Sequence, residues 1–303
     1  MKGHKNHRLT QIDFTWGESP DPAVNEQPSS QQTPQTVVQP KKKRAFADSA
    51  AQSTFVDVKD TAPWDVFSVN LRVKLDVWLS KATRKDDPEG LFAVRTYPKD
   101  GADRVLQRYK TLHHENLVTA TEIYRTDDPD EHLFVASEYI PFTLNHVEAC
   151  VRRPSDTELA SIVGQILHGV AYLHSEGLRH GALNCSNVLV TFDGVIKIAG
   201  FAASHIHRGN AIDYGDEKAA GLIMMQLIHK EQPMDGKIRI SDHLRGEKLI
   251  DFLAQTELGS RADHLAKHPF LADSNGRPTW RASHLRDLLT DVAYSSQVNY
   301  IRG

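Results

Sequence analysis

The chain has 303 residues, of which 40% are hydrophobic and 25% are charged, and its net charge is −3 at pH 7. This length suits one large domain or two small ones. The near-neutral charge gives no electrostatic reason to expect nucleic acid or an anionic membrane as a partner. Two isolated cysteines, Cys150 and Cys185, do not make a disulfide framework and favour a reducing compartment.

The sequence predicts neither a secretory signal in its first residues nor a membrane-spanning stretch. Residues 1–16 lack the apolar core of a secretory signal. The most apolar stretch, residues 219–228, is well short of the ~20 residues that a membrane-spanning helix needs. We therefore expect a soluble, intracellular protein.

Residues 1–62 are predicted to form a mostly disordered tail. Proline and glutamine are frequent between residues 17 and 44, and apolar periodicity is lacking, so this stretch cannot bury enough surface to offset chain entropy. Apolar side chains alternate from Ile12 to Trp16. That pattern suits either a strand added to another sheet or an apolar patch of disordered chain.

A compact basic run follows Pro40 in this tail. It consists of Lys41, Lys42, Lys43 and Arg44. Such a run in an exposed chain is typical of a nuclear localisation signal, and a solvated charge cluster has the same composition. The first interpretation predicts the nucleus and the second the cytoplasm.

Strands are predicted first along the ordered part, which we expect to begin at residue 63. Apolar side chains alternate from Phe67 to Leu79, too long a run for one strand, so a turn is expected at a position that the pattern does not give. Further strands are predicted at residues 91–97 and 133–139. A short helix is predicted at residues 102–112.

Helices dominate after residue 155. Ser155 and Glu158 have the spacing of a capping box, and the helix that they begin should end at Gly177. Short strands at residues 188–190 and 195–198 flank an Asp193-Gly194 turn. Later helices are predicted at residues 217–229, 247–255, 262–268 and 280–292. This order of strands and then helices is typical of an α+β fold.

The segment from His180 to Val190 resembles the protein-kinase catalytic loop, H-R-D-L-K-P-x-N, and it follows a long helix as that loop does. Other kinase motifs occur in the family's order. They are Phe92-Ala93-Val94-Arg95 for V-A-I-K, His114–Val118 for H-P-N-I-V, Phe134–Tyr139 for the hinge strand with Ser137 as gatekeeper, Gly200-Phe201-Ala202 for D-F-G, and Arg261 with His268–Leu271 for the end of the C-lobe.

The resemblance implies a bilobal protein-kinase-like domain over residues 63–272. Its small β-rich N-lobe would span about residues 63–138, and its larger helical C-lobe would span about residues 139–272. Residues 273–303 would form a C-terminal extension with one helix, which either braces the domain or offers its leucine face to a partner.

The positions that should move phosphate are changed. The catalytic aspartate is replaced by Ala182, the loop lysine by Asn184 and the D-F-G aspartate by Gly200. Phosphoryl transfer depends on positioning and on charge neutralisation by metal. Asn187 alone is a poor ligand for a hard dication. No catalytic residue is therefore assigned.

The nucleotide cleft is expected to be degenerate too. The residues that would line it are Ala93, Arg95, Ser137, Glu138 and Asn187. The glycine-rich loop positions fall on Asn70, Arg72 and Leu75, none of which is glycine. The glutamate that should pair with the lysine replaced by Arg95 is Val105, or Asp103 in a shifted register.

Residues that hold the fold together in the family are kept. Tyr109, His180 and Phe201 match a packed column between the lobes. Asp216 matches the aspartate whose carboxylate accepts catalytic-loop N–H groups, and Gly221 follows it at the family spacing. Arg261 is present, but the A-P-E glutamate that usually pairs with it is missing. The segment between Gly200 and Asp216 is short for the family.

Sixteen histidines suggest a metal site, but the candidate pairs, His113-His114, His205 with His207, and His264 with His268, have no third ligand at metal spacing. We expect no metal. A basic setting that would activate Cys185 is likewise not apparent.

The first hypothesis is a pseudokinase that binds a protein partner, with an active enzyme as one candidate, and that uses no cofactor. The first alternative is an unconventional ATP-binding kinase that recruits Glu138, Asp193 or Asp213. The second is a nuclear interaction protein recognised through its tail.

Overall fold

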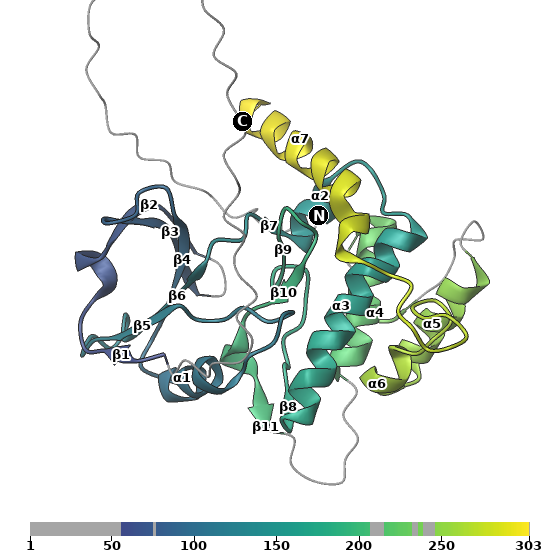
Figure 1. The fold of residues 1–303 in the computed structure, drawn as a ribbon, viewed down its shortest axis with the longest axis horizontal. Helices are drawn as coiled ribbons and strands as arrows, with labels where there is room; N and C mark the ends of the chain where they lie inside the picture. The colour runs from purple at the N-terminus through teal and green to yellow at the C-terminus, as the bar shows by residue number, and fades with distance from the viewer. Residues whose placement is uncertain (1–55, 75–76, 207–214, 232–235, 239–245, 303) are drawn as a thin grey trace, which may run out of the picture. The chain divides into compact units, whose positions relative to one another are not determined.

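The protein is represented by a computed structural model that describes residues 56–74, 77–206, 215–231, 236–238 and 246–302 (Figure 1). The chain divides into Met1–Thr54 and Phe55–Gly303, and every described element belongs to the second unit. Both tail motifs, Ile12–Trp16 and Lys41–Arg44, lie outside the described residues, as does Asp213.

The N-terminal part of this unit is a six-stranded sheet in the order β1-β5-β6-β4-β3-β2. Its strands are β1 (Val58–Lys59), β2 (Phe67–Lys74), β3 (Trp78–Arg84), β4 (Leu91–Tyr97), β5 (Glu122–Arg125) and β6 (Leu133–Glu138). β1 pairs with β5 in parallel, and the other neighbours are antiparallel. The long alternating run is therefore two strands, with the break between Lys74 and Trp78. β1 lies before residue 63, so the sheet begins earlier than we expected.

A short 3-10 turn, Pro63–Asp65, covers one face of this sheet. Phe67, Tyr124 and Phe134 are buried on that face, and the ring of Trp64 meets that of Phe134 edge-on at 5.5 Å. Strand residues alternate between faces. The opposite face is therefore left to line the cavity described below.

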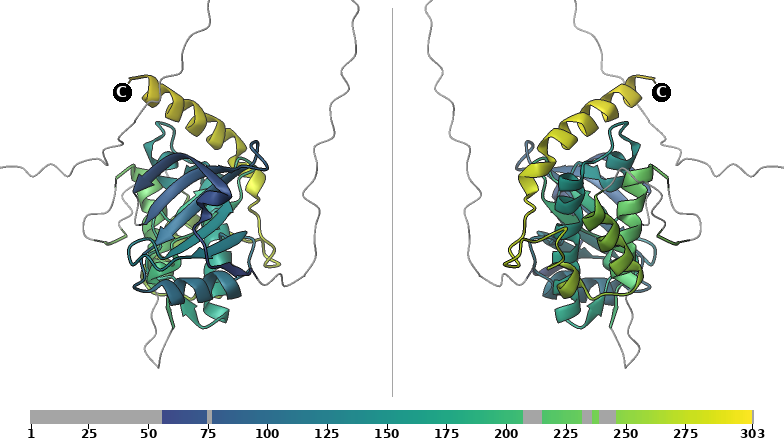
Figure 2. Two further views of the ribbon diagram at one scale, coloured as in Figure 1. Left: turned by 90° about the vertical axis from the view of Figure 1, so that its left-hand side faces the viewer. Right: turned by 90° about the vertical axis from the view of Figure 1, so that its right-hand side faces the viewer.

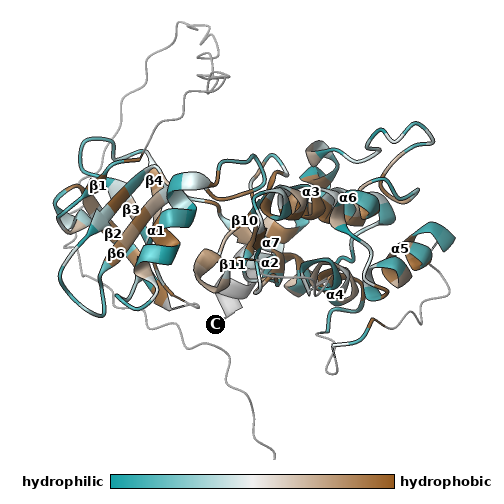
Figure 3. Ribbon diagram, turned by 90° about the horizontal axis from the view of Figure 1, so that it is seen from below, coloured by the Kyte–Doolittle hydropathy of each residue, from teal (hydrophilic) through white to brown (hydrophobic). Residues whose placement is uncertain are grey.

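One helix, α1 (Ala102–Thr111), packs beside the sheet through Val105 and Tyr109, which are both buried (Figure 2). Its remaining residues are mostly hydrophilic (Figure 3). The predicted helix at residues 102–112 is confirmed to within one residue.

The C-terminal part is built on α3 (Asp156–Ser175). The Ser155–Glu158 capping box is confirmed: Ser155 Oγ accepts the Glu158 N–H at 3.3 Å, and the Glu158 carboxylate accepts the Ser155 N–H at 2.7 Å. The elements around α3 are β7 (Phe142–Thr143), α2 (Leu144–Ala149), β8 (Leu178–Arg179), β9 (Val188–Val190), β10 (Ile196–Ile198), η2 (Phe201–Ala203), β11 (His205–Ile206), α4 (Gly215–His229), α5 (Glu247–Glu257) and α6 (Ala262–Leu265). The expected α+β class and two-lobed fold are confirmed.

The last segment, η3 (Ala282–Leu285) and α7 (Arg286–Arg302), belongs to the core. A Cβ on Gly164 of α3 would overlap the Trp280 ring, so the chain lies directly against the helix. The apolar side chains Leu285, Leu288, Leu289 and Val292 are buried. This helix therefore braces the domain, and its leucine face is not exposed to a partner. Among the described residues, no helix has the length and apolar character to cross a bilayer.

Candidate functional site

The catalytic-loop segment is held by a buried carboxylate. Asp216, near the start of α4, accepts the backbone N–H of His180 at 2.8 Å and that of Gly181 at 3.0 Å. His174 lies 3.2 Å from the same carboxylate. Burial alone would raise the pKa of Asp216, but these three hydrogen bonds more than offset it, so the pKa lies below its usual value. The expected role of Asp216 as an acceptor for the loop is confirmed.

The packed column also forms as expected. The Phe201 ring stands between those of Tyr109 and His180, with centroids 5.4 Å and 5.9 Å away. His180 Nε2 is 2.8 Å from the Ala199 carbonyl oxygen. Gly221 serves packing, because a Cβ there would overlap Thr256 of α5. The column therefore joins α1 to the loop before β9.

The polar groups of the loop are used by the loop itself. Asn184 Oδ1 accepts the N–H groups of Ser186 and Asn187 at 2.9 Å and 3.1 Å. The side-chain amide of Asn187 donates to the Ala182 carbonyl at 2.9 Å, and Asn184 Nδ2 donates to the same oxygen at 3.2 Å. Ala182 has no side-chain acceptor. A substrate hydroxyl would meet no carboxylate at this point.

The position of the D-F-G aspartate is closed as well as changed. Gly200 has φ +86°, and a Cβ there would lie 2.7 Å from Cγ of Asn187. Glycine adopts this left-handed backbone at no steric cost, and aspartate and asparagine are among the few other residues that enter it. Asn187 therefore fills the space that a side chain at this position would need.

Arg95 on β4 has a different partner from the one expected. Its side chain is 7% exposed, and it donates to Ser137 Oγ at 3.1 Å. Val105 is buried and apolar, whereas Asp103 is exposed and pairs with Arg125 at 3.1 Å. The shifted register that would offer Asp103 to Arg95 is therefore wrong.

A cavity of about 300 Å³ lies between the sheet and the loop. Ala93, Arg95 and Asn187 are among its lining residues, so three of the five positions expected at the nucleotide cleft are brought together, and Gly200 at the D-F-G position joins them. The two other predicted cleft residues, Ser137 and Glu138, are not in the lining. Glu138 instead pairs with Lys197 at 3.3 Å. None of the described residues that line it is acidic.

A buried charged network near α4 was not predicted. Glu217 accepts from Arg179 at 3.4 Å and from the Ala262 N–H at 3.2 Å, and His174 Nδ1 lies 3.5 Å from it. Arg261, whose usual glutamate is missing, is a surface residue beside Asp263 at 3.0 Å. The sequence carried one signal for this network. Arg179 directly precedes His180 and Glu217 directly follows Asp216, so each charged residue stands beside a residue of a buried motif.

The metal and thiol alternatives find no further support. Among the described residues, no group of three His, Cys, Asp or Glu side chains could hold a metal ion; His207 lies outside this part. His268 pairs with Asp251 at 2.8 Å. Burial raises the pKa of Cys185 to about 12, so its thiol is protonated at neutral pH.

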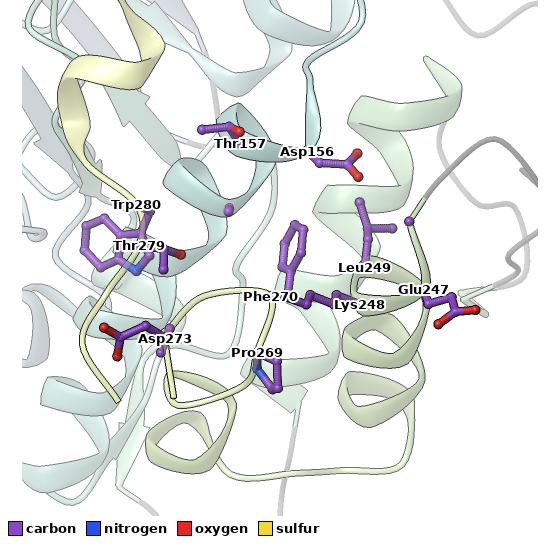
Figure 4. A pocket seen from close by; sticks show the side chains of 13 residues that line it. Asp156, Thr157, Glu247, Lys248, Leu249, Pro269, Phe270, Asp273, Thr279 and Trp280 are labelled. Atoms are coloured by element: carbon purple, nitrogen blue, oxygen red, sulfur yellow. The ribbon is translucent and has the colours of Figure 1, made fainter. Parts of the chain in front are cut away.

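A larger cavity, of about 680 Å³, lies in the C-terminal part between α3, α5 and the segment at residues 269–280 (Figure 4). Phe270, Asp273 and Trp280 line it. None of the kinase-motif positions weighed for catalysis or nucleotide binding lines it, so it is separate from the candidate site.

Comparison with known proteins agrees with the motif order. A family model described as the protein kinase domain matches residues 93–219. A protein named "Probable serine/threonine-protein kinase RTK1" from Saccharomyces cerevisiae is 36% identical over 94 residues, which are 31% of this chain and 14% of that protein. Cyclin-dependent kinase 11 of Dictyostelium discoideum is 32% identical over 105 residues, covering 34% and 27%.

Mitogen-activated protein kinase mpkC of Aspergillus fumigatus is 27% identical over 196 residues, covering 57% of this chain and 48% of that protein. The chain therefore spans less than half the length of each of these relatives. The matched residues include Arg95, the catalytic-loop segment and Asp216. With its fold, its motif order and its kinase relatives, the chain belongs to the protein kinase-like superfamily.

Proposed function

We propose that this protein is a pseudokinase, a binding and regulatory module that has lost phosphoryl transfer. The observation that carries the proposal is the pair of replaced carboxylates. Ala182 offers no base, and Gly200 offers no metal ligand at a position where a Cβ would overlap Asn187. The neighbouring polar groups are already used within the loop.

The expected loss in the rate of phosphoryl transfer is large enough to support this interpretation. A positioned general base contributes roughly 10²–10⁴-fold to a rate. Loss of the magnesium ligand lowers the rate further, though the two effects do not add. From a typical kinase turnover of about 1–100 s⁻¹, the remaining rate would be too low to serve signalling.

The retained residues suit a scaffold. Asp216 and the column of Tyr109, Phe201 and His180 fix the loop and link the lobes without any phosphate chemistry. A stable kinase-like surface is sufficient for binding a protein partner. We propose an active enzyme as the class of partner, in the cytoplasm or, if Lys41–Arg44 acts as an import signal, in the nucleus.

The proposal of an unconventional kinase has less support. Of its three candidate carboxylates, Glu138 is paired with Lys197, and Asp193 is exposed in the β9–β10 turn. Neither lines the cavity. The tail remains a second proposal, in which residues 1–62 recognise the partner.

Thermal stability with ATP, with and without magnesium, tests the proposed loss of the metal site. A ligand at 100 times its Kd stabilises by ~2.7 kcal/mol, or several degrees for a domain of this size. We expect magnesium to add no stabilisation. A shift that appears only with magnesium would contradict the proposal.

Partner capture with the full chain and with residues 1–54 deleted, a deletion that keeps β1 in the sheet, separates scaffold from tail. Under the first proposal, capture survives the deletion. If capture is lost while the deleted protein keeps its melting temperature, the tail is the recognition element. Alanine replacement of Lys41–Arg44 that leaves the location unchanged would rule out the import signal.

A further inference from the structure

The six-stranded sheet ends on one side at β1, a strand of two residues. Among the described strands, β5 would be the edge of the sheet without it (Figure 1). Val58 pairs with Ile123 and Lys59 pairs with Tyr124, so β1 covers two of the four residues of β5. A strand edge offers backbone N–H and C=O groups to any extended segment that fits. β1 therefore occupies a strand-accepting site.

The two side chains of β1 contact opposite faces of the sheet, as successive residues of a strand do. Val58 packs, partly buried, against the core cluster that contains Ile123. Lys59 lies on the other face, with Nζ 5.0 Å from the centre of the Tyr124 ring and 2.5 Å from Glu122 Oε2. The site therefore accepts an apolar side chain followed by a basic one.

The charges around Lys59 are balanced only while that lysine is in place. Glu122, whose side chain is 13% exposed, also pairs with Arg84, which in turn holds Asp86 at 2.8 Å. Burial alone would raise the pKa of Glu122, but hydrogen bonds from Lys59 and Tyr124 and the charge of Arg84 hold that pKa below its usual value. Without Lys59, two carboxylates would share one guanidinium.

β1 can leave the sheet without disturbing the turn that follows it. Residues 60 and 61, which connect the two, are exposed. The turn has its own anchors, because the Trp64 ring meets that of Phe134 at 5.5 Å and Lys85 Nζ donates to the Trp64 carbonyl at 3.1 Å. The Lys59 side chain is 48% exposed, and ion pairs at such positions add little stability. β1 is therefore a weakly held strand.

We propose that the outer edge of β5 binds an extended segment of a partner protein, in which an apolar residue precedes a basic one, and that this segment displaces β1. The inference rests on the proposed binding role of the protein and adds to it the surface and the kind of partner. The partner's apolar residue takes the place of Val58, and its basic residue takes that of Lys59 beside Glu122.

A different protein fits this edge better than a second copy of the chain. A second copy offers the same β1, which its tether already holds near the edge at a high effective concentration. A longer strand from a partner gains pairs at Glu122 and Arg125, which β1 does not make. Such a strand competes with β1 through additional backbone hydrogen bonds.

Peptide binding to the full chain tests the proposal. The probe is a labelled peptide with the sequence of residues 55–61, and its control peptide has glutamate in place of the lysine. In the double variant Val58→Asp/Lys59→Glu, β1 is released because it loses its apolar contact and repels Glu122. The edge of the parent is free only in the molecules whose β1 has left, so the released variant should bind the probe at least about tenfold more tightly.

Two further variants assign the binding to this edge. Glu122→Gln in the released variant should weaken the probe by about tenfold, as should glutamate in the peptide, because each change removes a charge-assisted hydrogen bond. Lys267→Glu, in the parent, reverses an exposed lysine of the C-terminal part and is the control for the change of charge. It should bind the probe as the parent does.

Equal binding of the probe by the parent and the released variant, or equal binding of the two peptides, overturns the inference and leaves the pseudokinase proposal in place. If the released variant does not fold, hydrogen exchange on the parent decides. Excess probe should lower the protection of the amides at residues 58 and 59, and unchanged protection overturns the inference. A parent that forms dimers which the probe separates would assign the edge to a second copy and overturn it too. Phosphate transfer by the parent would overturn the proposed function instead.

Discussion

Gly200 and Asn187 lie so close that a Cβ on Gly200 would be 2.7 Å from Cγ of Asn187. In an active kinase these two positions hold the metal ions together. Here, Gly200 has φ +86° and the Asn187 amide donates to the Ala182 carbonyl at 2.9 Å. The retained Asn187 therefore occupies the space that the missing side chain at Gly200 leaves.

Restoring the aspartate should therefore damage the protein. We expect Gly200→Asp to lower the free energy of unfolding by about 1–3 kcal/mol, through strain and overlap with Asn187, and to gain no magnesium-dependent stabilisation by ATP. Denaturant unfolding and thermal shift measure these two quantities.

Gly101 provides the matched control for this change. It has φ +79° but nothing within 4 Å of a Cβ, so Gly101→Asp adds backbone strain alone and should cost less. Adding Asn187→Ala to Gly200→Asp should recover part of the loss. The opposite result would be a Gly200→Asp variant that is as stable as the parent and gains magnesium-dependent stabilisation by ATP. It would show that the site still accepts a carboxylate without rearrangement.

Asp216 should be essential to stability in a pH-dependent way. Asp216→Ala leaves the buried N–H groups of His180 and Gly181 without an acceptor and should cost about 3 kcal/mol or more. Because the pKa of Asp216 is lowered on folding, its contribution is present above the unfolded pKa of about 3.9 and is lost as the pH falls through the folded value.

The comparison variant for this effect is Asp216→Asn, which keeps one acceptor oxygen and does not titrate. Unfolding by urea from pH 6 down to pH 3 should show the parent losing its advantage over Asp216→Asn below about pH 4. A difference that stays constant across this range would mean that the carboxylate makes no charge-dependent contribution.

Much of this architecture could be predicted from the sequence because the signals are local. The capping box at Ser155, the alternation from Phe67 to Leu79 and the Asp193-Gly194 turn each depend on neighbours within a few residues. The motif order then supplied the fold. The functional consequence of Ala182 and Gly200 also follows from side-chain chemistry, since neither has a carboxylate.

The remainder depends on pairs that are distant in the sequence. Nothing in the order of residues shows that Arg95 meets Ser137, or that β1 pairs with β5. Periodicity could not decide whether Val105 or Asp103 of α1 faces Arg95. The two residues are about half a turn apart, so a register error of two residues exchanges the face that is predicted to lie inward. Burial of Val105 decides it.

The network of Arg179 and Glu217 should behave as a coupled pair. Glu217→Ala leaves Arg179 without its buried counter-charge and should cost about 3–5 kcal/mol. Changing both residues to leucine should cost much less than the sum of the single changes. A double-mutant cycle in denaturant unfolding measures the coupling, and additive effects would contradict the described pairing.

The last helix should be required for folding. Leu288 is 1% exposed, and Leu288→Ala should lower the free energy of unfolding by about 2–5 kcal/mol. Leu258, 78% exposed at the end of α5, is the matched control, and Leu258→Ala should change stability by less than about 0.5 kcal/mol. Equal effects of the two changes would mean that α7 does not pack as described.

Phosphate transfer from labelled ATP, measured with magnesium and with manganese on the purified full chain, tests the central claim most directly. An active protein kinase is the positive control, and Ala182→Asp tests whether the missing base alone is limiting. The account predicts no protein-dependent incorporation by the parent and none by Ala182→Asp, since the metal ligand at Gly200 is still missing. Stoichiometric incorporation by the parent that is lost in Arg95→Leu would contradict it and make the protein an active kinase.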